Sequence, residues 1–269
     1  MRLPASALRA ATVAAWLLAL FLGLPVGALL VRSVAGGSLP GAFASREVLD
    51  ALVLSLVTTA ASLTLAVLLG TPLAMVLARR RFPGARLVEV LVDLPIVLPP
   101  SVAGLGLLLL LGSRGLLGGP LASVGLELPF TTVAVVLAQL FVSAPFFVRS
   151  ARTGFAGVDR DLEDAARVDG GSEASVFRFI TVPLAAPALA AGMVMAWARA
   201  LGEFGATIMF AGNITGRTQT LPLVVYSQFQ SSLDASIAAA AILVVAAFGV
   251  LLAVRLIHWR PVGELRSVV

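Results

Sequence analysis

Six apolar runs dominate the chain, and shorter polar segments separate them. The runs cover about residues 11–31, 51–77, 88–111, 130–148, 184–211 and 235–257. A helix of about 20 apolar residues crosses the roughly 30 Å hydrocarbon core of a bilayer. None of these runs has the polar face that a helix on the surface of a soluble domain shows. The pattern therefore predicts an all-α, polytopic membrane protein with six transmembrane helices.

The composition supports one membrane domain over residues 1–269. The chain is 59% hydrophobic and 12% charged, with a mean hydropathy of +1.02, whereas soluble domains are about 45–50% apolar and about 25% charged. The N-terminus looks like a signal peptide, but the run at 11–31 is longer than the apolar core of one, so we expect a retained first span. The chain has no cysteine, which excludes disulfides and thiolate chemistry.

The arginines predict the orientation, because cytoplasmic loops collect basic residues. All nineteen basic residues are arginine. With the N-terminus inside, fourteen fall on the inner face, four fall on the outer face, and Arg199 lies within a span. Both termini and the loop at 149–183 are therefore predicted to face the cytoplasm. The net charge of +5 then reflects topology, and no nucleic-acid partner is expected.

The longest inner loop contains a charged segment at about 159–183. Acidic residues gather where a helix is expected to begin, which favours the positive end of its dipole. Gly170 and Gly171 are expected to end that helix, Ser172 to cap the next one, and Pro183 to close it before the fifth span. The pattern predicts a helix–turn–helix across the inner mouth of the bundle, and a plain solvated connector is the alternative. The acidic residues are Asp159, Asp161, Glu163 and Asp164.

Ionisable residues within spans mark either a pathway or an ion pair, because each costs about 2.5–3.5 kcal/mol at the centre of a helix. Arg199 and Glu203 are spaced i, i+4, so they share a helix face and are expected to pair. A structural pair and a role in a pathway both remain open for them. Glu89 and Asp93 stand near the inner start of the third span, where reaching the interface is the simpler interpretation.

Prolines interrupt the third span at DLPIVLPPSVAGLG. Proline removes backbone donors and breaks a helix, and in a bilayer such a break survives only inside the bundle or beside a watery cavity. Freed N–H groups, helix N-termini or the hydroxyl of Ser101 have the chemistry to hold a dehydrated oxyanion there. Pro99, Pro100 and Ser101 are therefore candidate pathway or gate residues, together with Arg199 and Glu203.

The chain lacks the residues that several other classes of function require. The chain has no G-x-x-x-x-G-K-[ST] sequence and no lysine, so it cannot hydrolyse ATP by a P-loop. An intramembrane hydrolase would need a base or metal cluster that the single histidine, His258, does not supply, or a second aspartate to face Asp93. An ion channel would not explain the long patterned inner loop. A transport subunit without an ATPase site, cofactor or metal fits best.

The charged loop resembles the signature E-A-A-x3-G-x9-I-x-L-P of the permease subunits of ABC importers. Asp164 replaces the usual Glu and Val182 the usual Leu. The resemblance implies a cytoplasmic coupling helix that docks on a separate ATPase subunit, in the type I importer permease fold. The coupling residues that it implies are Glu163, Asp164, Ala165, Ala166, Gly170, Ile180 and Pro183.

A second resemblance concerns the cargo. LPIVLPPSVAGLGLLLLLG and AWARALGEFGATIMFAGNITGRTQTLPLVVY look like molybdate/tungstate permeases and, less closely, sulfate permeases. This implies a homodimer in the cytoplasmic membrane of a prokaryote, two ATP-binding subunits, and an extracytoplasmic oxyanion-binding protein that Arg217 is a candidate to contact. Molybdate or tungstate is the expected cargo, and sulfate or thiosulfate is the alternative.

Overall fold

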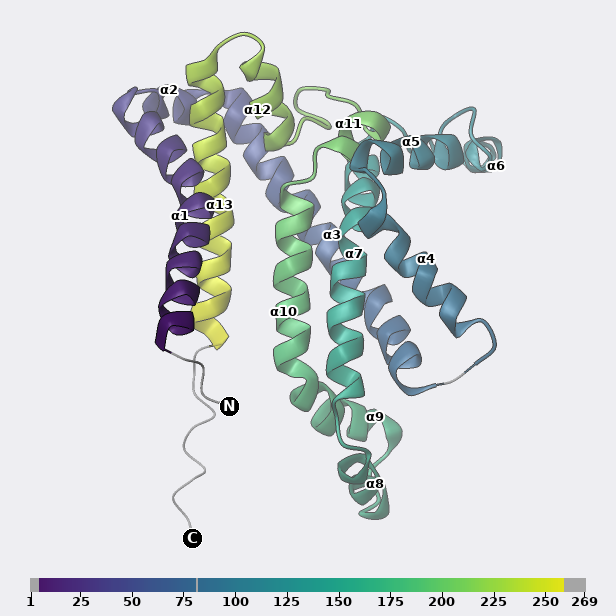
Figure 1. Cartoon of the computed structure of the whole chain (residues 1–269). Helices are drawn as coiled ribbons and strands as arrows, with labels where there is room; N and C mark the ends of the chain where they lie inside the picture. The colour runs from purple at the N-terminus through teal and green to yellow at the C-terminus, as the bar shows by residue number, and fades with distance from the viewer. Residues whose placement is uncertain (1–4, 81, 259–269) are drawn as a thin grey trace.

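The computed structural model describes residues 5–80 and 82–258, and every regular element within them is helical. Five long helices extend between the two ends of the molecule (Figure 1). Each is long and apolar enough to span a membrane, with α10 taken together with the helical residues that precede it. The all-α prediction is confirmed. The five are α1 (Ala5–Ala35), α3 (Arg46–Arg79), α7 (Thr132–Ala156), α10 (Val182–Leu201) and α13 (Leu233–His258).

Short helices mark the two ends. One end carries α8 (Arg160–Val168) and α9 (Glu173–Val176), and we refer to it as the α8 end. The opposite end, the α12 end, carries α2 (Leu39–Ala44), α6 (Gly118–Ser123) and α12 (Leu221–Phe229). In Figure 1 the start of α1 and the finish of α13 both lie toward the α8 end, as six crossings would require.

The core is formed where α7 packs between α3 and α10. Small residues bring the backbones close: a Cβ on Gly192 of α10 would lie 2.8 Å from the Ser150 Cβ, and one on Gly70 of α3 would lie 2.9 Å from a ring carbon of Phe147. The Ser150 hydroxyl also donates a hydrogen bond to the Ala188 carbonyl at 2.7 Å. Small residues and hydroxyl bonds of this kind are what hold transmembrane helices together, since lipid supplies no hydrophobic drive.

The predicted third span is broken at its prolines. It consists of α4 (Ala85–Val97) and α5 (Pro100–Leu111), which are bent relative to each other by 119°. Pro99 is the residue before the first turn of α5, and Pro100 occupies that turn, where its missing N–H costs nothing. The bent pair counts as one span or as a re-entrant element, so the structure has five continuous spans and up to six in all.

The predicted fifth span at 184–211 is wrong at both ends. No break occurs at Pro183, because a π-helical turn, η1 (Phe177–Thr181), runs directly into α10 and the Val182 N–H bonds back to the Phe177 carbonyl. The wider turn accommodates the residue that has no donor. At the other end α10 stops at Leu201, and a separate short helix, α11 (Gly205–Phe210), follows.

Candidate functional site

The helix–turn–helix predicted in the charged loop is present as α8, a glycine turn and α9. Asp159 caps α8, where its carboxylate accepts the Asp161 N–H at 3.0 Å. Gly170 has φ +88°, the left-handed conformation expected after a helix C-terminus. Ser172 caps α9 by accepting the Ser175 N–H at 3.2 Å. Each of these signals depends only on neighbours in the sequence.

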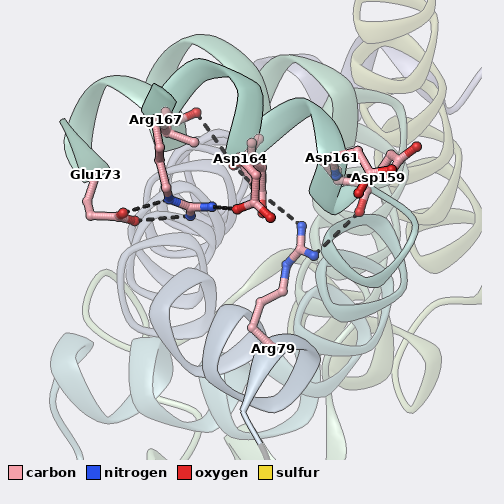
Figure 2. Close-up of polar contacts among 10 residues, drawn as sticks. Arg79, Asp159, Asp161, Asp164, Arg167 and Glu173 are labelled. Carbon is pink, nitrogen blue, oxygen red and sulfur yellow. Dashed lines mark hydrogen bonds and ion pairs between the residues drawn. The ribbon is translucent and has the colours of Figure 1, made fainter. Parts of the chain in front are cut away.

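Glu163 lies on the inner face of α8 and is buried, with 6% of its side chain exposed. Its Oε1 accepts a hydrogen bond from Arg79 at the end of α3, at 2.9 Å, and another from the Thr181 hydroxyl in η1, at 2.6 Å. Arg79 also donates to the Val158 carbonyl at 3.4 Å. Figure 2 shows the Arg79 side chain pointing toward α8. One carboxylate therefore ties α8 to both α3 and the start of α10.

The opposite face of α8 is exposed and mixes charge with apolar surface. Asp164 has 68% of its side chain exposed and bonds Arg167 at 2.6 Å. Leu162 and Val168 are also exposed, Val168 to 87%. Ala165 is exposed beside them, whereas Ala166 and Ile180 are half-buried and Pro183 is exposed.

Arg167 joins α8 to α9 on this outer face. Its guanidinium lies between Asp164 and Glu173, as Figure 2 shows, and donates to the two Glu173 oxygens at 2.7 and 3.2 Å. The hydrogen bond and charge of Arg167 lower the pKa of the Glu173 carboxyl, and the same partners raise the pKa of Arg167. Both shifts favour the charged forms of the two side chains.

The proline break of the third span lies against the glycine break of the fifth. A Cβ on Gly205 would lie 2.8 Å from the Pro100 Cβ and 3.0 Å from the Ser101 nitrogen. A Cβ on Gly104 of α5 would lie 2.6 Å from the Ala206 carbonyl oxygen of α11. Two segments singled out separately in the sequence are thus in backbone contact. Pro99, Pro100 and Ser101 lie exposed on the surface of the single chain.

Arg199 and Glu203 form the predicted ion pair, and Glu203 is buried at the end of α10. The second Glu203 oxygen accepts the Ala206 N–H at 2.7 Å. The carboxylate therefore caps the first turn of α11 as well as balancing Arg199. This bond, together with the low helix propensity of Gly202, explains why α10 stops at Leu201.

Glu89 and Asp93 of α4 pair with arginines of α7. Arg152 approaches Glu89 to 2.9 Å and Arg149 approaches Asp93 to 3.7 Å, across a cavity of about 380 Å³. All four side chains are partly exposed, and that Glu89 and Asp93 reach the inner interface stays a prediction. The arginine partners were not identified from the sequence.

Arg217 lies in an ordered loop at the α12 end. Its side chain is exposed, and its carbonyl accepts a hydrogen bond from Thr132 at the start of α7, at 2.9 Å. Nearby, Gly212 has φ +73° and a Cβ there would lie 2.9 Å from the ring of Phe130, itself a non-glycine residue at φ +59°. The loop is thus held to α7 while the guanidinium stays free to face outward.

No cluster of three or more His, Cys, Asp or Glu suited to a metal ion occurs in the part of the chain that the structure describes. Charged side chains instead form pairs, within α8–α9, between α4 and α7, and between α10 and its C-terminal turn.

Comparison with known proteins identifies the family. Residues 70–258 match the family model described as binding-protein-dependent transport system inner membrane component. The molybdenum transport system permease protein ModB of Mycobacterium tuberculosis is 46% identical over 204 residues, which cover 76% of this chain and 77% of that protein. The probable molybdenum ABC transporter permease protein of Haloferax volcanii is 42% identical over 248 residues, which cover 92% and 89%.

Solved structures show the same fold at low sequence identity. A bacterial ABC transporter involved in the import of the acidic polysaccharide alginate matches with a TM-score of 0.73 at 18% identity, covering 93% of this chain and 94% of that one. A bacterial alginate ABC transporter in complex with alginate pentasaccharide-bound periplasmic protein matches with a TM-score of 0.70 at 18% identity, covering 95% of this chain and 93% of that one. The chain therefore belongs to the family of binding-protein-dependent inner membrane components, the permease subunits of ABC importers.

Proposed function

We propose that this permease forms the path by which a tetrahedral oxyanion, molybdate or tungstate, enters the cytoplasm, driven by a separate ATPase. The assignment of the cargo rests on the sequence identity of 41–46% to several permeases described as molybdenum transporters, in both bacteria and a haloarchaeon. Sulfate or thiosulfate is the alternative that the experiment must separate. The chain acts as a transport subunit, and hydrolysis of ATP belongs to its partner.

We assign docking of the ATPase to the exposed surface of α8, which carries Leu162, Asp164 and Val168. The buried side of the same helix is bonded through Glu163 to Arg79 and Thr181. A displacement of α8 by the ATPase would therefore act on α3 and α10 together. Glu163 is in this proposal an internal link, and it does not contact the partner itself.

The cargo path is assigned to the broken helices. Pro99, Pro100 and Ser101 are exposed on the single chain and offer a hydroxyl and a helix N-terminus. A second copy facing this surface would enclose them, which supports a homodimer with two ATPase subunits. Arg199 is neutralised by Glu203, so the path carries little fixed charge of its own and selection of the ion falls to the extracytoplasmic binding protein. Arg217, exposed at the α12 end, is the candidate contact for that protein.

Calorimetry of the cognate binding protein against molybdate, tungstate and sulfate tests the cargo. We expect molybdate and tungstate to bind at least about 100-fold more tightly than sulfate, a difference of about 2.7 kcal/mol. Comparable affinity for all three ions would remove support for molybdate and tungstate as the cargo. Tight binding of sulfate alone would favour the alternative.

A further inference from the structure

Helix α4 packs on the bundle through Val92 and through ion pairs with α7, but much of its surface stays open. None of its residues is buried, and a cavity of about 380 Å³ separates part of it from α7 and α3. We call this the polar pocket. It is lined by two arginines of α7 and two carboxylates of α4, with Thr153 beside them. The charged residues are Arg149, Arg152, Glu89 and Asp93.

A second, apolar cavity of about 350 Å³ continues from the first. It lies in the elbow between α4, α5 and α7, and its lining includes Pro95, Phe141 and Ala144. We call it the apolar pocket. The two pockets share Val92 and Val148 in their walls, so they form one surface that is charged toward the α8 end and apolar toward the middle of the spans.

We propose that the two pockets together bind one phospholipid whose headgroup carries a phosphate and a primary ammonium, with an acyl chain in the apolar pocket. A guanidinium has five N–H donors and a carboxylate engages about two of them in a fork, so Arg149 and Arg152 retain donors for a phosphate. Glu89 and Asp93 accept from the ammonium. The pocket holds two positive and two negative groups, which matches a zwitterionic headgroup.

The charge balance favours this occupant over an anionic lipid. An anionic headgroup has no ammonium for Glu89 and Asp93, so only the two arginines would offset the repulsion between its phosphate and these carboxylates. The position of the two pockets along the spans also fits a lipid. Charged groups near the end of α7 suit the headgroup region of a bilayer, and the leucines of the apolar pocket suit its hydrocarbon. The proposal is independent of the cargo and of the path.

Native mass spectrometry of the full-length permease, purified in its intact complex, tests the site with phosphatidylethanolamine and phosphatidylglycerol as probes. We expect one retained phosphatidylethanolamine per permease chain, roughly tenfold preferred over phosphatidylglycerol. Ala144→Phe fills the apolar pocket and should abolish retention. Leu68→Phe makes the same kind of change on an exposed face of α3 and should leave retention unchanged.

Charge variants report on the headgroup independently of packing. Arg149→Gln with Arg152→Gln should remove retention of both lipids. Glu89→Gln with Asp93→Asn keeps the arginines and should shift the preference to phosphatidylglycerol. Equal retention of both lipids by the unaltered protein, or unchanged phosphatidylethanolamine retention in Ala144→Phe, would overturn the proposal.

A second copy of the chain is the competing occupant of the apolar pocket. The chain has no cysteine, so Ala144→Cys introduces a unique thiol. Efficient disulfide cross-linking between two Ala144→Cys chains in the membrane would show a protein covering this pocket and would overturn the lipid assignment. Absence of cross-linking, with loss of the lipid on labelling of the thiol by a bulky maleimide, is the expected result.

Discussion

Glu163 differs from the other acidic residues of its helix because it faces inward. A buried carboxylate is costly unless it is paired and hydrogen-bonded, and Glu163 receives bonds from Arg79 and Thr181. Asp164, the next residue, faces outward and accepts a hydrogen bond from its neighbour Arg167. Adjacent acidic residues thus have separate tasks, one holding α8 to the spans and the other shaping its exposed surface.

Replacing Glu163 with Ala should loosen α8 from the bundle. The change leaves the Arg79 guanidinium, 13% exposed, without its carboxylate, and breaking a buried pair costs about 3–5 kcal/mol. Hydrogen exchange of the α8 amides should accelerate in proportion. Asp164→Ala removes an exposed pair, worth about 0–1 kcal/mol, and is the matched control. Equal effects of the two substitutions on α8 exchange would contradict the anchoring role.

Among individual residues, the sequence predicted contacts between near neighbours and missed contacts between residues far apart in the chain. The caps by Asp159 and Ser172 and the left-handed Gly170 depend on residues a few positions away, so the sequence signals sufficed. Arg79 lies 84 positions from Glu163. Its partnership arises only when α3 and α8 come together, and no local pattern marks it.

At the scale of helices, the two broken spans form one feature. The first turn of α5 packs on α11 so closely that side chains are excluded at Gly104 and Gly205. Prolines break one helix, and the Glu203 carboxylate caps the short helix after the other break. The close packing covers one side of the break with α11, whereas Pro99, Pro100 and Ser101 stay exposed on the single chain. A break at membrane depth survives only inside a bundle or beside a watery cavity, so we expect one of these to meet the exposed side.

Gly104→Ala should disturb this contact. The added methyl would lie 2.6 Å from the Ala206 carbonyl oxygen, so α5 or α11 must move, at a cost of about 1–3 kcal/mol. We expect a lower thermal transition and reduced substrate uptake. Gly106→Ala lies on the same helix with nothing within 4 Å of its Cβ, and it should be neutral or slightly stabilising. Wild-type uptake by Gly104→Ala would contradict a close α5–α11 contact.

Predictions of where helices begin and end succeeded where apolar length and prolines determine the boundary. They failed where a hydrogen bond formed in the folded chain determines it. Apolar length located the spans, and the prolines located the bend between α4 and α5. The early end of α10 depends on a side-chain bond from Glu203, and the continuity through Pro183 depends on the π-turn η1. Apolar length favoured a span that continues to residue 211, and the proline favoured a break at residue 183. Helix α12 was also missed, since its nine residues are too few to cross a bilayer and gave no span signal.

For the whole molecule, the single chain leaves much apolar surface open. The most hydrophobic window of α1 has no residue buried, and α4 has none either. Lipid covers part of such surface in a membrane, and the proposed second copy would cover the face with Pro99 and Ser101. In our proposal the charged α8 end binds the ATPase and the Arg217 loop at the opposite end binds the delivering protein, in the orientation that the arginines predict.

The most direct measurement is ATP hydrolysis by the importer reconstituted in vesicles with molybdate-loaded binding protein outside. The loaded protein should stimulate hydrolysis in the unaltered complex, and Gly170→Leu should abolish that stimulation while the chain remains inserted. Gly170 has φ +88°, where a leucine costs about 1–2 kcal/mol and Asn is better tolerated, so Gly170→Asn should retain most of the stimulation. Full stimulation in Gly170→Leu, or none by the molybdate-loaded protein in the unaltered complex, would contradict a molybdate permease coupled to its ATPase through α8.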